Sequence, residues 1–183
     1  MSNSAGVVVE RVGADQLRAR RQQILDLHRA CYAPAPWNLS ADEIAGYEGA
    51  LDRHLNIPGL EAVTAVEGEA LVGVAYGFPG PERLPDDDGG FYGSVVEALG
   101  RRAAEGLVSG RPFEVAQVMV GRDVQGRGVG RAVFDLLVAD KPRAWLVTLP
   151  GSPASRLYAA AGWQRLAPRI SLRGRENEIW AFP

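Results

Sequence analysis

Three closely spaced glycines mark the part of the sequence whose composition is best suited to chemistry. They lie at positions 126, 128 and 130, between an apolar run at Phe113–Val120 and an amphipathic run that begins at Val129. Glycine lets a backbone approach a phosphate closely, and the first N–H groups of a helix have no partner within it and attract anions. A strand, a glycine-rich turn and a helix start therefore predict a site for a pyrophosphate group.

Two common phosphate-binding motifs are excluded, one by a missing triplet and the other by the spacing of the glycines. A Walker A loop needs a Gly-Lys-Ser/Thr triplet, which occurs nowhere in the sequence. A dinucleotide-binding fold needs G-x-G-x-x-G and an acidic residue at the end of the next strand. Here the glycines alternate as G-x-G-x-G, and the next apolar run ends Thr148-Leu149-Pro150. From the residues alone, a turn that merely connects strand to helix stays open as an alternative.

Composition narrows the class of protein. A chain of 183 residues is long enough for one domain, 1–183, with a sizeable core. With 20 basic and 22 acidic residues, its net charge of −2 argues against nucleic acid or an anionic membrane as the main partner. The lone Cys31 excludes an internal disulfide, and we expect no metal site because no His, Cys or acidic cluster has ligand spacing. Without a signal-peptide pattern or a long apolar run, we expect a cytoplasmic protein with no membrane span.

The N-terminal half predicts a strand, two helices and a hairpin. Residues 7–12 form a β-branched run, and Asp15 is placed to cap the following helix. Ser40 and Glu43 form a capping box for a second helix. Apolar runs at 60–66 and 70–78, separated by Glu-Gly-Glu, predict an antiparallel hairpin. His28 and His54 fall within the two expected helices, and we interpret both as surface or packing residues.

The C-terminal half predicts alternating helices and strands. We expect a loop at 79–90, a helix at 91–105, and a central strand at 111–120 that is apolar enough to be covered on both faces. A helix from Val129, a strand at 143–149, a helix capped by Ser152 and a closing hairpin at 163–172 and 177–182 follow. Because strands first pair locally and then alternate with helices, we expect a mixed sheet with helices on both faces.

Two motifs resemble those of one enzyme family. The run Gln125-Gly126-Arg127-Gly128-Val129-Gly130 resembles the Q/R-x-x-G-x-G/A motif of the GNAT N-acetyltransferases, and residues 154–163, ASRLYAAAGW, resemble the family's A-x-x-L-Y-x-x-x-G-F pattern. Trp163 replaces the usual phenylalanine. The resemblance is strong over residues 114–163 and loose over the N-terminal hairpin. It implies an α/β (α+β) fold: a mixed, mostly antiparallel sheet with helices on both faces and a splayed central strand pair.

The resemblance implies that acetyl-CoA is the co-substrate. Backbone N–H groups of the glycine-rich turn would bind its pyrophosphate, and the central strand would pair with its pantetheine arm. The cofactor-binding residues expected on this basis are Val118, Met119, Val120, Gln125, Gly126, Arg127, Gly128, Val129, Gly130, Arg131, Ser152 and Ser155. Arg127 facing solvent is an alternative. Many family members carry an asparagine where this sequence has Gly151 or Ser152, so the chain departs from the family pattern at this point.

The implied reaction is transfer of the acetyl group to a primary amine, by direct attack in a ternary complex. An alkyl amine with a pKa near 10.4 is mostly protonated at pH 7, so the reaction needs a general base or a water chain. Glu114 matches the place on the central strand where family members carry a glutamate base; the alternative is a glutamate that faces solvent. Tyr158 matches the family's tyrosine opposite the thioester sulfur, where a phenol can act as general acid; the alternative is a core tyrosine.

The sequence says less about the acceptor. In the family, specificity lies in the N-terminal helices and loops. Four aromatic residues are candidates to line an acceptor pocket: Trp37, Tyr47, Phe91 and Tyr92, with core packing the alternative for Tyr47. The aspartates at 86–88 could attract a cationic amine. We expect a small-molecule amine rather than a protein lysine, and a homodimer by family analogy. The alternative function is a regulatory or sensing domain that binds acetyl-CoA without turnover.

Overall fold

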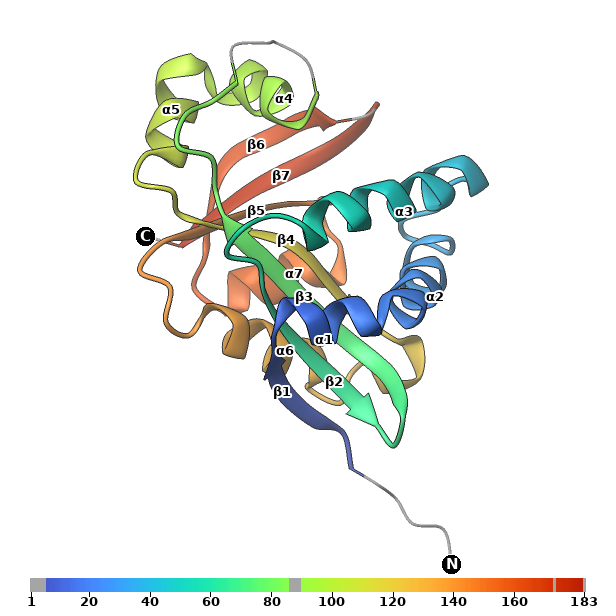
Figure 1. Cartoon of the computed structure of the whole chain (residues 1–183). Helices are drawn as coiled ribbons and strands as arrows, with labels where there is room; N and C mark the ends of the chain where they lie inside the picture. Colours follow the sequence, from blue (N-terminus) through green and yellow to red (C-terminus); the bar gives the residue numbers. More distant parts are fainter. Residues whose placement is uncertain (1–5, 86–89, 173, 183) are drawn as a thin grey trace, which may run out of the picture. The chain divides into compact units, whose positions relative to one another are not determined.

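The computed structural model describes residues 6–85, 90–172 and 174–182, and it excludes the side chains of residues 167 and 168 (Figure 1). The aspartates at 86–88 lie outside the described residues. The described chain divides into two compact units. One runs up to Phe78 and includes Ala116–Asp140; the other consists of Pro79–Val115 and the residues from Lys141 onward. That residues 1–183 form a single domain stays a prediction.

The first unit contains an antiparallel sheet. Its strands are β1 (Val8–Val12), β2 (Glu61–Glu67), β3 (Ala70–Pro79, up to Phe78) and the C-terminal part of β4 (Phe113–Val120). β1 pairs with β2 from Val8 opposite Val66 onward, and β2 pairs with β3 through a turn in which Gly68 has a φ of 64°. The predicted hairpin is confirmed.

Helices cover both faces of this sheet. Its helices are α1 (Ala14–Ala19), α2 (Arg21–Tyr32), α3 (Ala41–Leu55) and α6 (Val129–Val138). The cluster on one face joins α1, α2 and α3 to alternate strand residues such as Ala62 and Val74. On the other face, the Val129 side chain of α6 lies against Gly73 of β3. Figure 1 shows α1 and α6 on opposite sides of β2.

The first expected helix differs from the prediction. Asp15 does not cap it. The N-cap is Gly13, whose N–H donates to Gln16 Oε1 at 2.9 Å, and Asp15 instead forms an ion pair with Arg18. The helix is also divided at Arg20, which has a φ of −95° and a ψ of 12° and separates α1 from α2. The capping box at Ser40 is confirmed, since Glu43 N–H donates to Ser40 Oγ and the Glu43 carboxylate accepts from Ser40 N–H.

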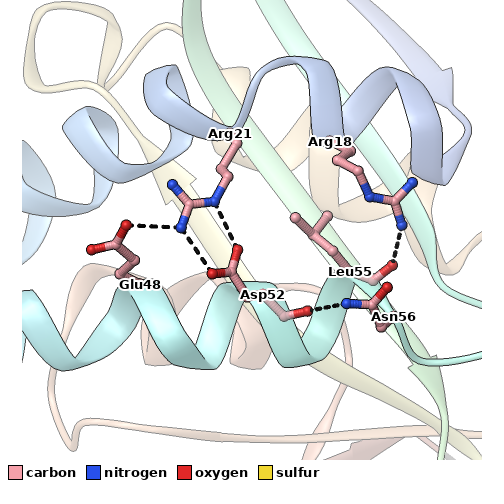
Figure 2. Close-up of polar contacts among 6 residues, drawn as sticks. All are labelled: Arg18, Arg21, Glu48, Asp52, Leu55 and Asn56. Atoms are coloured by element: carbon pink, nitrogen blue, oxygen red, sulfur yellow. Dashed lines mark hydrogen bonds and ion pairs between the residues drawn. The ribbon is translucent and has the colours of Figure 1, made fainter.

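Two arginines connect α3 to the helices before it (Figure 2). The Arg21 guanidinium donates to both carboxylate oxygens of Asp52, at 2.7 and 2.8 Å, and to Glu48 at 2.8 Å. Arg18 donates to the carbonyl oxygen of Leu55 at 2.9 Å, near the end of α3. The Arg21 guanidinium holds the pKa of Asp52 below its ordinary value. A bidentate pair within a charge network is the kind of surface ion pair that contributes to stability.

We therefore expect Arg21→Gln to lower the melting temperature, because it removes all three contacts to α3. The loss should shrink in 1 M salt, which screens exposed charges. Arg20→Gln is the matched control, since the Arg20 side chain donates to Gln23 of α2 and forms no ion pair with α3 among the described residues, so its loss should change little. Thermal unfolding followed by circular dichroism in low and high salt would measure the melting temperatures of both variants. Equal losses in the two variants would contradict the role of the α2–α3 contact.

The second unit contains the rest of the sheet. Its strands are the start of β4, β5 (Ala144–Thr148), β6 (Gln164–Leu172) and β7 (Arg175–Phe182). β7 lies between β5 and β6 and is antiparallel to both. β4 and β5 are parallel, and their ladder comprises only Phe113–Ala144 and Glu114–Trp145. A mixed, mostly antiparallel sheet is thus confirmed, and the short parallel ladder fits strands that diverge.

The helix expected at 91–105 is two helices. They are α4 (Gly90–Leu99) and α5 (Arg101–Val108), separated by Gly100 with a φ of 78°. A left-handed residue cannot continue a right-handed helix, so the chain turns there. α7 (Pro153–Ala160) begins as predicted, with Ser152 as N-cap and proline at its first position. The core of this unit surrounds the fully buried Trp145 and includes Val95, Leu107 and Ile179.

Candidate functional site

The glycine-rich turn of the first unit has the backbone conformation that only glycine adopts readily. After β4, a 3-10 turn at Arg122–Val124 leads to Gly126 and Gly128, whose φ angles are 76° and 82°. Gly128 is the N-cap of α6. A Cβ built on either glycine would meet no atom within 4 Å. The two glycines are therefore needed for their left-handed conformation, and the turn faces open space that a ligand can enter.

The start of α6 offers backbone donors. Ala132 N–H donates to Gly128 O at 3.0 Å, and Arg127 N–H donates weakly to Val124 O at 3.4 Å. Within the described residues, no backbone carbonyl accepts from the N–H of Gly128, Val129 or Gly130. Val129 packs against Gly73, where a Cβ would lie 3.2 Å from the Val129 side chain. The N-terminus of α6 is thus held in place by packing and, in the described part of the chain, has unpaired backbone N–H groups. Such an N-terminus is suited to bind the phosphates of coenzyme A.

The polar side chains of the turn have partners in the same unit. Gln125 Nε2 donates to Val120 O at 3.0 Å, which ties the turn to the end of β4. Arg127 forms an ion pair with Glu67 at 3.0 Å, and Arg131 pairs with Asp135 one helical turn later. The side chains of both arginines are about half exposed, and each lies beside a carboxylate. Their contribution to coenzyme A binding stays a prediction.

One edge of β4 faces α2. Gly121 N–H donates to Val72 O of β3 at 2.8 Å. By the alternation of a strand, the carbonyls of Val118 and Val120 point the other way. Val118 O lies 3.4 Å from the Tyr32 hydroxyl, and Val120 O accepts from Cys31 Sγ at 3.3 Å. Met119, between them, buries its side chain in the core. That this edge of β4 pairs with pantetheine stays a prediction, and sequence reasoning missed the two α2 residues that contact it.

Glu114 is the buried carboxylate of the second unit. It lies on β4 and is only 7% exposed, so the alternative of a glutamate facing solvent is wrong. The Tyr92 hydroxyl of α4 donates to Glu114 Oε2 at 2.7 Å. Burial raises the pKa of Glu114 from 4.5 to about 7, although the Tyr92 hydrogen bond opposes the rise. A carboxyl group with a pKa near neutrality can accept a proton and release it again at physiological pH.

Tyr158 lies on α7 and is also buried. Its ring packs against Trp163 at a centroid distance of 6.1 Å, and Trp163 packs in turn against Phe182. Burial raises the pKa of the Tyr158 phenol above its ordinary value of 10, so the group stays neutral and can donate a proton. Its roles as general acid and as core tyrosine are compatible with this burial.

The two serines expected near coenzyme A form the N-cap of α7. Ser155 N–H donates to Ser152 Oγ at 3.1 Å, and the Ser155 hydroxyl donates to Ser152 O at 3.3 Å. Both side chains are buried. They hold the start of the helix that carries Tyr158. A direct contact between either serine and coenzyme A stays a prediction.

The aromatic residues suggested for an acceptor pocket differ in their surroundings. Tyr47 is in the core, as its alternative held: its hydroxyl lies 2.8 Å from that of Tyr76, and its ring stacks on His28. Burial lowers the pKa of His28 to about 4 and also lowers that of His54. His28 is only 4% exposed, so it is a packing residue. Trp37 packs edge-on against Tyr32, and Phe91 stacks against Trp145.

Within the part of the chain that the structure describes, no helix has the length and apolar character to cross a bilayer. Among the same residues, no group of three or more His, Cys, Asp or Glu side chains has a geometry that could hold a metal ion.

Comparison with solved structures shows the fold. An acetyltransferase of the GNAT family from Streptococcus agalactiae covers 98% of this chain and 96% of its own, with a TM-score of 0.65 and 14% identity. The ribosomal-protein-S18-alanine N-acetyltransferase from Escherichia coli covers 97% and 94%, with a TM-score of 0.61 and 13% identity. A PaiA N-acetyltransferase from Thermoplasma acidophilum, in complex with coenzyme A, covers 96% and 98%, with a TM-score of 0.60 and 8% identity.

Sequence comparison adds nothing to this result, because no protein-family model and no curated protein matches the chain. The structural likeness nevertheless extends over nearly the whole chain. The protein therefore has the GNAT fold, as the two sequence motifs predicted.

Proposed function

We propose that this protein is an N-acetyltransferase that moves an acetyl group from acetyl-CoA to the primary amine of a small molecule. The observation that carries the proposal is Glu114, a buried carboxyl group on β4 of a GNAT fold with a pKa of about 7. A neighbour with the same fold was solved with coenzyme A. The open N–H groups at the start of α6 and the left-handed glycines before it fit the pyrophosphate of that ligand.

The reaction is direct attack within a ternary complex. Removing a proton from an amine with a pKa near 10.4 at pH 7 costs about 4 kcal/mol. In the proposed mechanism Glu114 accepts this proton, and the amine nitrogen then bonds to the thioester carbonyl carbon. When the carbon–sulfur bond breaks, the sulfur keeps the electron pair and takes a proton from Tyr158, and the nitrogen of the new amide releases its surplus proton to water. Glu114 and Tyr158 return to their starting states by proton exchange with water.

The proposed acceptor rests on the sequence alone. A small-molecule amine follows from the sequence expectation, whereas one structural neighbour is named for acting on a protein N-terminal alanine. The alternative function is a regulatory or sensing domain that binds acetyl-CoA without turnover. Such a domain would use the same glycine-rich turn to bind the pyrophosphate. The buried Glu114 favours the enzyme, because a binding module has no need of a carboxyl group with a pKa near 7. A homodimer and a cytoplasmic location remain proposals from the resemblance and composition.

An acceptor screen with detection of free thiol tests the function. The panel should contain diamines, amino acids, aminoglycosides and a peptide with a free N-terminal alanine. We expect thiol release with at least one small amine and less with the peptide. Calorimetric titration with acetyl-CoA runs alongside. No binding at millimolar concentration would refute the enzyme and the sensing domain together. Binding with no turnover on any amine would favour the sensing domain.

The glycine-rich turn yields a separate prediction. Gly128→Ala should raise the KM for acetyl-CoA, because a φ of 82° costs an L-residue about 1–2 kcal/mol and moves the first N–H groups of α6. Gly46→Ala, at an exposed position in α3 without a positive φ, is the control, and helix propensity predicts that it stabilises slightly. Steady-state kinetics and thermal unfolding of both variants separate a binding defect from a general one. An unchanged KM in Gly128→Ala would remove this turn from the binding site.

A further inference from the structure

A helical segment of the second unit connects β3 to β4 in the sequence, and hydrogen bonds join its two ends. Residues 80–112 contain α4 and α5. At the two ends, Gly80 N–H donates to Pro112 O at 2.9 Å, and Arg111 Nε donates to Gly80 O at 3.0 Å. The segment thus leaves and rejoins the sheet at one point, directly before Phe113 and Glu114.

Helix α4 of this segment is packed beside Glu114. Val95 of α4 is fully buried, and Phe91 stacks on Trp145 with ring centroids 5.7 Å apart. Trp145 is also fully buried and is the register partner of Glu114 on β5. The contacts with Trp145 fix the start of α4 over the strand pair that carries Glu114.

Tyr92 is the residue of α4 that contacts Glu114. Its ring packs beside those of Phe91 and Trp145, at centroid distances of 5.1 and 6.3 Å. Its hydroxyl donates to Glu114 Oε2 at 2.7 Å, the length of a charge-assisted hydrogen bond. Burial raises the pKa of Tyr92 well above its ordinary value, and the charge of Glu114 adds to the rise. The phenol therefore stays neutral and remains a donor.

The surroundings leave Tyr92 as the main polar influence on Glu114. Phe113 and Val115 flank it on β4, and Trp145 is its register partner on β5; none of these carries a charge. The Lys141 ammonium, at the start of the chain segment that leads to β5, lies over the Phe113 ring at 5.0 Å. Within the described residues, Tyr92 is the titratable group that acts on the Glu114 carboxyl.

We infer that Tyr92 is a positioning residue: it holds Oε2 of Glu114, turns Oε1 toward the proton to be removed, and makes helix α4 part of the catalytic site. The inference rests on the proposed function in its use of Glu114 as the base. Within the described residues, Oε1 has no hydrogen-bond donor, so it is the oxygen left to accept a proton from an amine. The helical segment between β3 and β4 accordingly positions the general base.

Tyr92→Phe in the full chain tests the inference without relying on activity. The protein is labelled with glutamate carrying ¹³C at the carboxyl carbon, and the Glu114 signal is assigned by its loss in Glu114→Gln. We expect the Glu114 carboxyl to titrate about one pH unit higher in Tyr92→Phe, because the charged form loses a hydrogen bond worth more than one pKa unit in a dry site. An unchanged titration would overturn the inference.

Phe91→Leu is the matched control. It alters the packing of α4 against Trp145 and leaves the Tyr92 hydroxyl in place. We expect its Glu114 titration to match the wild type; an equal rise in both variants would assign the effect to packing and overturn the inference. If Tyr92→Phe does not fold, the wild type serves instead. Its Tyr92 hydroxyl proton should give a slowly exchanging signal that disappears in Glu114→Ala, which has no side-chain oxygen to accept it. Equally fast exchange in the wild type and in Glu114→Ala would refute the hydrogen bond.

The pH dependence of kcat/KM separates this inference from the proposed function. If both hold, the acidic limb of the profile moves upward in Tyr92→Phe by the same amount as the carboxyl titration, and activity returns at high pH. If the carboxyl titration moves and the rate profile does not, Tyr92 holds Glu114 as inferred, but Glu114 is not the base.

Discussion

Glu114→Gln is expected to lower kcat/KM by about 10²–10⁴ at pH 7, the usual contribution of a general base. The amide keeps the shape of the side chain and an oxygen for the Tyr92 hydroxyl, but it cannot accept the proton of the amine. Affinity for acetyl-CoA should stay as it is. In the wild type, kcat/KM should rise with pH through about 7, the pKa of Glu114, and this limb should be absent from the variant. Steady-state rates between pH 5 and 9 would measure both effects.

The same substitution has a stability signature that does not depend on the substrate. The pKa of Glu114 is higher in the folded protein than its ordinary value of 4.5, so the folded state binds a proton more tightly than the unfolded state. The free energy of unfolding therefore falls as pH rises from about 4.5 to about 7, by roughly 3 kcal/mol for this group. Urea unfolding should show that this part of the decline is missing in Glu114→Gln.

Glu178→Gln provides the control for both measurements. Glu178 is as buried as Glu114, at 5% exposure, but it forms an ion pair with Arg165 and accepts from Trp180 Nε1. Its loss should destabilise the protein and leave the acidic limb of kcat/KM in place. A wild-type limb that persists in Glu114→Gln would show that a chain of water molecules, rather than Glu114, removes the proton.

Local features of the sequence were sufficient for most elements of the fold. The Ser40 and Ser152 caps, the hairpin around Gly68 and the glycines of the turn at Gly128 depend on neighbours within a few residues. The errors arose where several local choices compete. Both Gly13 and Asp15 can start a helix, and at Gly100 the apolar periodicity continued although the backbone turned.

The surroundings of the site could not be predicted in the same way. The family resemblance points to Glu114, but Tyr92 of α4, which contacts it, lies 22 residues earlier in the chain. Cys31 and Tyr32 contact the edge of β4 across 89 and 86 residues. Such contacts follow from how helices pack on the sheet, and a single sequence carries no local signal for them. This is why a pKa near neutrality emerged only from the structure.

Tyr158→Phe is expected to lower kcat by about 10² and to leave the KM for acetyl-CoA unchanged. Phenylalanine keeps the ring that packs against Trp163, so the change is confined to the hydroxyl. A buried phenol that stays neutral can protonate the leaving sulfur, and without it the thiolate must depart as an anion in a dry site. The deficit should appear in single-turnover rates as well as at steady state, because it belongs to the chemical step.

Varying the thiol of the acyl donor tests the role of the Tyr158 hydroxyl more directly. A thioester whose thiol has a lower pKa leaves more readily as an anion, so the deficit in Tyr158→Phe should shrink with such a donor if the phenol protonates sulfur. Tyr76→Phe is the control, since Tyr76 is a buried tyrosine bonded to Tyr47 in the core of the first unit. It should lower stability and leave kcat alone. A deficit in Tyr158→Phe that is the same for both donors would mean that the Tyr158 hydroxyl does not protonate the leaving sulfur.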